Sequence, residues 1–527
     1  MKRLLFFLPL SFSYLLFHAQ CNTTNITGDY IVNSSIILSG TYNVSGKFVV
    51  PSGVTVFVGK HSNNSCGKLE INAANIIING AINADDAGFT GGAGGAGGVD
   101  VTSITGDVVS LTDCSNKDNT GQVTVEGGTQ GNQGTGPGGS QPGLPGQNGS
   151  GPKQQCLTND DEAGMIGSGG GAGGGAGGSY GGQGGNASQG GNGTNFYSSS
   201  GVNVSTGYAV VAGNGGLNGN PGIVYGTTSA NDIELGSGGA GAGGGGRSFI
   251  QGGNGGKGGN GGGCIKLIAQ DTLIISGVLS ANGSNGLNGG SGGNGGQTAK
   301  CCSDGCDDCG EANLSCGAGG GSGAGGGSGG GILLECYNHV NITSNLHAKG
   351  GNGGAGGLKG YGISCNYSAT FCGTQSLTSG DGNDGAQGGG AGGGRIKIIA
   401  GACALASTNP TTNVSGGTGF ANGATGTYNV ICSPVSLAEN TLYHQLKIFP
   451  NPAQQSIRIQ FKFPQFLKDN NASFHIYDIN SQLVISDPCI LNTTDTQEIN
   501  INELPSGIYF LRLISSEITV IEKIIKN

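Results

Sequence analysis

The tract Gly252–Gly263 reads GGNGGKGGNGGG, and glycine fills nine of its twelve positions. Similar Gly-Gly-x runs begin at Gly91 and Gly289, and the chain holds 116 glycines among its 527 residues. Glycine loses more conformational freedom on ordering than any other residue, so such a tract stays unfolded unless its backbone groups find partners. The glycine tracts therefore constrain the fold more than any other feature of the sequence.

The glycine tracts could adopt either of two structures. In a polyproline II helix three residues complete a turn, so Gly-Gly-x presents two bare edges and one decorated edge that points outward. Such helices would have to pack side by side, because a single one satisfies none of its own amides. The alternative is a set of flexible glycine loops. The recurrent junctions GGGCIKLIA, GGGILLE and GGGRIKIIA favour packing, since unrelated linkers need not end in the same way.

An apolar pattern with a period of two residues recurs between the tracts. Its copies start at Leu69, Ile265, Ile332 and Ile396. A period of two predicts strands with one buried face, and the small residues that follow predict corners at Gly80, Gly277 and Ser344. Short strands joined by such corners predict an all-β fold, a parallel β-helix with glycine-rich insertions, to which Thr41–Lys60 adds earlier coils. A β-sandwich is the alternative, but it needs longer strands and hairpin turns.

The N-terminus has the features of a secretory signal peptide. Lys2 and Arg3 precede the short apolar run LLFFLPLSFSYLLF, which predicts a signal over residues 1–20. The sixteen cysteines would then form disulfides in an oxidising compartment. The crowded segment Cys301–Cys316 is interpreted as a disulfide knot, with a zinc site at Cys306-x-x-Cys309 as the alternative.

The net charge of the chain limits the kinds of partner that it can bind. The net charge is −9, which argues against nucleic acid, because phosphate binding requires a basic surface. No segment after the signal has the character of a transmembrane helix.

The composition changes near Gly426, where glycine becomes rare. We therefore predict a passenger over residues 21–435 and a separate domain over residues 446–527. Segments such as LKIFPNPAQQSIRIQF alternate apolar and polar residues, which predicts a small antiparallel β-sandwich of about seven strands.

This last domain resembles the type A C-terminal sorting domain of the type IX secretion system of Bacteroidetes. The resemblance covers Leu446–Asn527 and depends on PNP, IYD, LPSGIYFLRL and a terminal Lys-apolar-apolar motif. The motif residues are Pro450, Asn451, Pro452, Tyr477, Asp478, Gly507, Tyr509 and Lys523. The sequence departs from the family at Ser481, where glycine is usual. The resemblance implies the type IX machinery as a partner, passage across both membranes, removal of the domain, and release or attachment at the surface. The passenger only loosely resembles repetitive bacterial surface proteins with β-helical coils.

Residues that could carry chemistry are few. Asp85-Asp86 is the one acidic pair at the end of a predicted strand, and a solvated corner is the simpler interpretation. His347 is predicted on the outer face of a strand. The acidic loop with Asp381, Asn383 and Asp384 supplies candidate Ca²⁺ ligands, and no other cofactor is expected.

These features favour a secreted or cell-surface structural or adhesive protein that acts by surface binding. Its partner would be a surface glycan or another copy of itself, and no catalytic residue is assigned. The first alternative is an extracellular β-helix enzyme that degrades glycans and depends on Asp85 or Asp86. The second is an ice-binding protein, which needs a regular face of Ala, Ser or Thr.

Overall fold

The structure is a computed structural model, and its chain divides into two compact units, Met1–Ser433 and Pro434–Asn527. It describes residues 21–62, 65–98, 122–124, 128–147, 150–152, 169–193, 197–198, 213–229, 232–247, 250–295, 316–362, 364–369, 373–378, 380–401, 410–433, 446–461, 473–480, 482–488, 496–514 and 519–527. The predicted signal peptide, the cysteines from Cys301 to Cys309 and Ser481 lie outside the described residues.

The first unit contains a parallel β-helix, as predicted. One sheet has the strand order β1-β4-β6-β11-β13-β18-β20, with β2 beside β4 and β14 beside β11. Its strands are β1 (Thr23–Ile26), β2 (Tyr30–Ile31), β4 (Gly40–Val50), β6 (Lys68–Ile78), β11 (Cys264–Ile275), β13 (Gly331–Cys336), β14 (His339–Ile342), β18 (Arg395–Gly401) and β20 (Thr427–Ser433). The second sheet runs β19-β15-β12-β7-β5-β3. Its strands are β3 (Ile36–Leu38), β5 (Thr55–Val58), β7 (Ala81–Asn83), β12 (Val278–Ser280), β15 (Asn345–His347) and β19 (Thr411–Asn413).

The four copies of the sequence pattern lie in register. Leu69 pairs with Ile265, which pairs with Ile332 in the next strand, and Ile332 pairs with Ile396. All four side chains are fully buried in one apolar cluster between the sheets. Burying an aliphatic side chain of this size stabilises the fold by about 1.5–3 kcal/mol, so the stacked rows supply the main driving force of the β-helix.

The predicted corners stack as closely as the strands. A Cβ added to Gly277 would lie 1.6 Å from the carbonyl oxygen of Gly80 in the coil below. That distance is far inside van der Waals contact, so no larger residue fits without moving the backbone.

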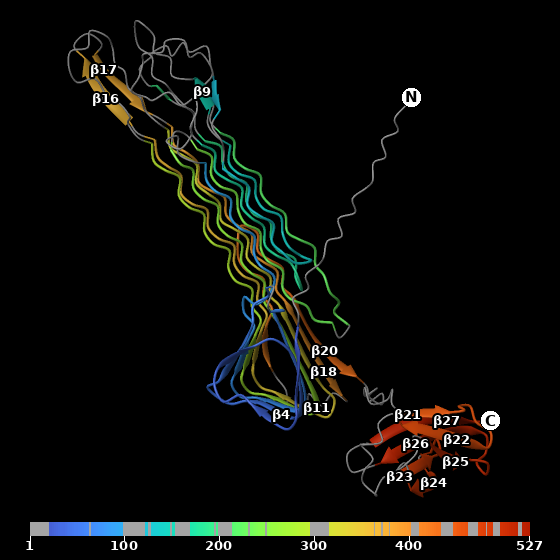
Figure 1. Cartoon of the computed structure of the whole chain (residues 1–527). Helices are drawn as coiled ribbons and strands as arrows, with labels where there is room; N and C mark the ends of the chain where they lie inside the picture. The colour runs from blue at the N-terminus through green and yellow to red at the C-terminus, as the bar shows by residue number, and fades with distance from the viewer. Residues whose placement is uncertain are drawn as a thin grey trace, which may run out of the picture. The chain divides into compact units, whose positions relative to one another are not determined.

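The described glycine tracts form packed extended threads that leave the β-helix side by side (Figure 1). Their hydrogen-bond partners alternate with a period of three residues. Donor and acceptor pairs at 2.8–2.9 Å are Gly255 with Gly95, Gly258 with Gly92, Gly256 with Ser322 and Gly259 with Gly325. Neighbouring N–H groups donate to different threads, and residues three positions apart donate to the same thread. The threads therefore have the three-residue turn of polyproline II. Packing, and not the flexible-loop alternative, describes these tracts.

Short antiparallel pairs lie at the ends of the threads away from the β-helix (Figure 1). β8 (Gln122–Thr124) pairs with β9 (Ser150–Pro152). β17 (Gly373–Thr378) pairs with both β16 (Ser364–Ala369) and β10 (Tyr197–Ser198).

The second unit contains two antiparallel sheets with seven strands in its described residues, as predicted. One sheet is β21 (Leu446–Phe449), β22 (Ser456–Phe461) and β25 (Thr496–Asn500). The other is β24 (Leu483–Pro488), β23 (Ser473–Tyr477), β26 (Gly507–Ile514) and β27 (Thr519–Lys526). Ile457 and Ile459 of the first sheet share one buried cluster with Phe474 and Leu511 of the second.

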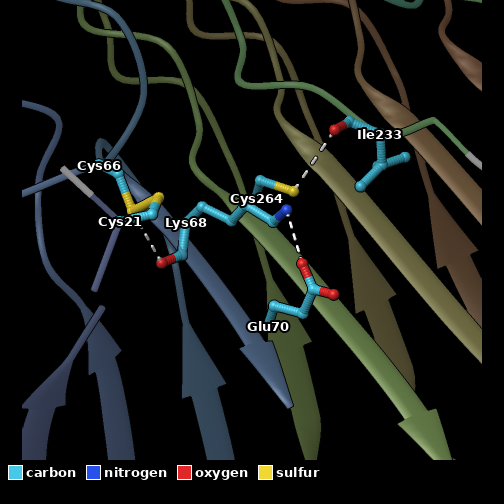
Figure 2. Close-up of a disulfide and its surroundings, with 6 residues drawn as sticks. All are labelled: Cys21, Cys66, Lys68, Glu70, Ile233 and Cys264. Carbon is cyan, nitrogen blue, oxygen red and sulfur yellow. Dashed lines mark hydrogen bonds and ion pairs between the residues drawn. A yellow bond between two sulfur atoms is a disulfide. The ribbon is translucent and has the colours of Figure 1, made fainter. Parts of the chain in front are cut away.

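The cysteines correct one expectation. Cys21 and Cys66 form a disulfide, and Cys264 beside them is a buried thiol (Figure 2). Cys336 is also a buried thiol. The Cys264 Sγ donates to the carbonyl of Ile233 at 3.8 Å, and the Cys336 Sγ lies 3.3 and 3.4 Å from the carbonyl oxygens of Asp271 and His339. The prediction that all sixteen cysteines pair was wrong for these two, because an even count does not reveal which strand face carries each side chain.

Candidate functional site

A row of asparagines decorates the exposed side of the glycine bundle. We call it the asparagine face: Asn282, Asn285, Asn288 and Asn294 on thread 281–295, and Asn352 on thread 348–362. In each, the side-chain oxygen Oδ1 accepts the backbone N–H of a residue on the next thread. The donors are Lys349, Asn352, Ala355, Tyr361 and Thr418, at 2.8–3.0 Å.

The asparagines solve a local problem of the bundle surface. At the third position of each triplet the backbone N–H points along the surface, where no further thread supplies a carbonyl. The Oδ1 of an asparagine on the neighbouring thread accepts this N–H instead of a backbone carbonyl. Its Nδ2 donates no hydrogen bond within the described part of the chain and is left for solvent or a ligand. Asn282, Asn285 and Asn288 follow one another about 9 Å apart along their thread, since polyproline II rises about 3.1 Å per residue, and Asn294 comes about 19 Å after Asn288, because Ser291 stands between them.

Other exposed side chains extend this face. Tyr361 follows Asn352 on the same thread, and the Lys359 Nζ lies 5.3 Å from the centre of its ring. Amide donors beside an exposed aromatic ring suit polar, uncharged ligands, because the amides bind hydroxyl groups and the ring packs against C–H groups.

The three candidate Ca²⁺ ligands lie beside this face. The Asp381 carboxylate binds Lys359 Nζ and the backbone N–H of Gly362, both at 2.8 Å. The Asp384 Oδ1 accepts the backbone N–H of Lys359 at 2.7 Å, and the Asn383 Nδ2 donates to the carbonyl of Asn192. Burial alone would raise the Asp381 pKa, but Lys359 and the Gly362 N–H outweigh it and lower that pKa. Within the described ranges, no group of three or more His, Cys, Asp or Glu is placed to hold a metal ion.

Asp85 and Asp86 lie where the β-helix meets the bundle. The Asp85 Oδ1 accepts the backbone N–H of Asn282 at 2.7 Å, and Asp86 binds Ser284 Oγ and Lys60. Both carboxylates therefore hold the first turn of thread 281–295. His347 is half-buried in β15, and burial, with the nearby charge of Lys349, lowers its pKa.

A buried ionic cluster on the outer face of the β-helix was not anticipated. Residues 225–229 and 232–235 lie across β18, and Arg395 and Lys397 of that strand are almost fully buried. The Lys397 Nζ binds the backbone carbonyl and the Oδ1 of Asp232, at 2.6 and 2.8 Å. The Arg395 guanidinium donates to the carbonyl of Tyr225 at 2.9 Å and lies over the ring of Tyr180. The sequence signal was the pair of cations in RIKIIA, an unusual start for a buried strand.

The charges in this cluster have shifted pKa values. Burial acts to raise the pKa of Asp232, but hydrogen bonds from Lys397 and Thr227 outweigh it and lower the pKa to about 2. Burial also raises the pKa of the Cys264 thiol to about 12. Figure 2 shows Lys68 extending past Cys264 to an ion pair with Glu70, at 2.7 Å. The cluster thus fastens residues 225–229 and 232–235 to the sheet, and the raised pKa keeps the Cys264 thiol protonated near neutral pH.

The second unit gathers two of the predicted sorting motifs. The Asn451 Nδ2 donates to the carbonyl of Lys523 at 2.7 Å, and its Oδ1 accepts the N–H of Ile525 at 2.8 Å. The flanking Pro450 and Pro452, which hold the turn before β22, are exposed. The PNP turn is therefore tied to the last strand, β27.

The other sorting-motif residues lie elsewhere in the same unit. Tyr477 ends β23, and the Asp478 Oδ1 closes the next turn by accepting the N–H groups of Asn480 and Gln482. Gly507 opens β26 and is exposed, without the left-handed backbone that would require glycine. The Tyr509 hydroxyl donates to the carbonyl of Pro505 at 2.8 Å.

These features describe a chain of two parts, a β-helix with a glycine bundle followed by a small β-sandwich that holds the turn motifs. Residues 447–527 match the family model described as "Secretion system C-terminal sorting domain". The second unit is thus a type IX secretion C-terminal sorting domain, which supports export to the cell surface or the extracellular space. No curated protein matches the chain. In its described residues, no helix is long and apolar enough to cross a membrane.

Proposed function

We propose that the first unit is a structural and adhesive protein of the cell exterior, which acts by binding a surface glycan and not by catalysis. The sorting domain supports its export. The binding role is supported mainly by the asparagine face, a row of amide groups whose oxygens accept backbone hydrogen bonds and whose Nδ2 groups donate none within the described residues.

The bundle beneath the face supports this role. Its donors and acceptors are paired between threads, and most of its glycines approach the neighbouring backbones too closely to admit a Cβ. A surface on such a scaffold has little freedom to lose when a ligand binds, which favours affinity. The row of donors with a spacing of about 9 Å along a thread matches an extended, repeating ligand better than a single small molecule.

A glycan array tests the proposal. The mature chain, residues 21–527, is compared with a variant that carries Asn285→Asp, Asn288→Asp and Asn352→Asp. Aspartate keeps the oxygen that accepts the backbone N–H and removes the Nδ2 donor, so the fold is retained while the binding groups change. The second unit alone serves as the blank. We expect the mature chain to bind polysaccharides and the triple variant to lose that binding.

Other outcomes would overturn the proposal. Equal binding by the triple variant would exclude the asparagine face as the site. Hydrolysis of a bound polysaccharide that is lost with Asp85→Asn would favour the glycan-degrading enzyme, and thermal hysteresis without glycan binding would favour an ice-binding protein.

A further inference from the structure

The β-helix has two open ends, and both expose residues that belong to its core rows. At one end Tyr428 and Val430 of β20 continue the rows of Ile396 and Ile398, which are fully buried. Yet Tyr428 is 39% exposed and Val430 is 40% exposed. The core is therefore uncovered at β20, as far as the described residues show.

The other end shows the same incompleteness. Ile36 of β3 lies in the row of Val56, which is fully buried, but Ile36 itself is 41% exposed. Beside it, β1 pairs with β4 on one side only. The two ends of the described β-helix thus both expose apolar residues, Ile36 at one end and Tyr428 with Val430 at the other, and at the β20 end the second sheet stops one coil earlier, at β19.

The edge strands also lack the usual protection. A strand paired on one side leaves alternate N–H and C=O groups open on the other, and proteins normally block such edges with charged residues or proline. The five strands at these edges, β1, β2, β3, β19 and β20, read TTNI, YI, IIL, TTN and TYNVICS. They contain no Lys, Arg, Asp, Glu or Pro.

We propose that the β20 end of one molecule docks on the β1 end of a second copy, so that the parallel β-helix continues from copy to copy. The register follows from the existing pairs. Val430 continues the inward row that runs through Ile398, Leu334, Leu267, Ile71 and Tyr42 to Thr24. Val430 of one copy therefore meets Thr24 of the next, since a shift by one residue would turn every apolar side chain outward.

Two further observations fit this assembly. The coils formed by β1–β3 and by β4–β5 carry no glycine thread, so the last thread of one copy, residues 414–426, faces two bare coils of the next. The contact joins two different surfaces and repeats in one direction, which makes the interface heterologous and the product a filament, not a closed dimer. The proposal does not depend on ligand binding, because none of its residues belongs to the asparagine face.

Two charge variants of the full mature chain test it. Thr24→Lys blocks one end and Val430→Lys blocks the other, because a lysine at either position places a charge in the apolar contact. Leu144→Lys is the matched control, because Leu144 lies on the bundle surface with an exposed fraction of 39%, close to that of Val430. We expect the wild-type chain and the control to sediment as multiples of the monomer, in proportions that rise with concentration, and each end variant to sediment as a monomer.

Mixing the two end variants gives the decisive measurement. Each retains one intact end, so the equimolar mixture should form a one-to-one dimer although neither component self-associates. That result also shows that both variants are folded. If Val430→Lys abolishes association while Thr24→Lys has no effect, the contact is between two β20 ends and the head-to-tail proposal is wrong. The proposal would also be overturned by a wild-type chain that stays monomeric at all concentrations while its β20 amides are protected from hydrogen exchange. In that case residues 434–445 or the second unit would cover this end of the β-helix.

Discussion

The side-chain oxygen of Asn285 accepts the backbone N–H of Asn352 at 2.8 Å, and these two residues lie 67 positions apart on adjacent glycine threads. Asn352 in turn accepts the N–H of Thr418 at 2.8 Å. The side chain that decorates one thread therefore completes the backbone hydrogen bonding of the next. This relay explains why asparagine recurs at the third position of the triplets on this surface.

The relay predicts different effects for two substitutions of Asn285. Asn285→Ala removes the acceptor of the Asn352 N–H, and an exposed hydrogen bond of this kind is worth about 0.5–1.5 kcal/mol. Asn285→Asp keeps an acceptor and should leave stability nearly unchanged. Hydrogen exchange at the Asn352 amide measures the effect, which should be faster in the alanine variant only. Equal exchange in both variants would contradict the relay.

The adjacent glycines Gly289 and Gly290 provide a second test, on packing. A Cβ at Gly289 would lie 2.0 Å from the carbonyl oxygen of Gly321, whereas one at Gly290 has its nearest neighbour, the Asn254 nitrogen, at 3.2 Å. We expect Gly289→Ala to destabilise the bundle by about 3 kcal/mol, as overpacking of a rigid core does. Gly290→Ala should change stability by less than about 1 kcal/mol, because the stiffer unfolded chain offsets the tight contact.

Thermal unfolding of the two alanine variants, followed by circular dichroism, checks this prediction. The pair is matched in composition and position, so any difference between them reports the thread contact itself. If both variants melt with the wild-type chain, the threads are not packed in solution.

Much of this fold could be predicted from the sequence, but the chemistry of its surface could not. The period-two rows at Leu69, Ile265, Ile332 and Ile396 predicted the strands, and their register confirmed them as coils. The polyproline II alternative for Gly252–Gly263 followed from the triplet pattern alone, yet the choice against loose loops required the partners, which lie on threads far apart in sequence. In the sequence the asparagine relay shows only as a recurrent separation of 67 residues between each asparagine and its donor, as between Asn285 and Asn352.

The buried charges could not be predicted in the same way. Arg395 and Lys397 stand at the outward positions of β18, where a solvated side chain is the usual expectation. They are buried because residues 225–229 and 232–235, which come much earlier in the chain, lie across them and supply Asp232 and the carbonyl of Tyr225. Nothing local in RIKIIA identifies that cover.

The ionic cluster predicts a pH dependence through Asp232. Its pKa is lowered from 3.8 to about 2 in the folded chain, so its contribution to stability is fully present above pH 3.8 and is lost as the pH falls toward 2. Because a third of the side chain remains exposed, solvent screening limits the contribution to about 1 kcal/mol.

Asp232→Asn isolates this contribution. Urea denaturation at several pH values should show the wild-type chain more stable than the variant above pH 3.8, with the difference shrinking as the pH approaches 2. A difference that is constant over this range would show that the Asp232 carboxylate does not stabilise the fold through its charge.

The buried thiol of Cys264 predicts a chemical difference among the cysteines. With its pKa raised to about 12 by burial, almost none of it is thiolate near neutral pH, and alkylation requires the thiolate. We expect iodoacetamide to leave Cys264 unlabelled in the native chain and to label it in urea, as read by peptide mass mapping. Labelling at the same rate in both states would mean that residues 232–235 do not cover this strand.

The last prediction concerns the sorting domain, in which one amide joins two motifs. The Asn451 side chain donates to the carbonyl of Lys523 and accepts from the N–H of Ile525, so it fixes the PNP turn to β27. Asn451→Ala removes both hydrogen bonds and should destabilise the domain by about 1–2 kcal/mol. Asn451→Asp loses only the donor and should have roughly half that effect. Hydrogen exchange of the β27 amides in the full chain measures the stability of this attachment.

The same two variants separate local stability from recognition by the secretion machinery. If export requires the attached form of the turn, the fraction of protein that reaches the culture medium or the cell surface should fall in the order wild type, Asn451→Asp, Asn451→Ala, in parallel with the exchange rates. Should Asn451→Asp abolish export while its β27 amides exchange almost as slowly as in the wild type, the amide donor itself would be read by the machinery. Normal export of Asn451→Ala, despite fast exchange at β27, would show that the tie between the two motifs serves only the stability of the domain.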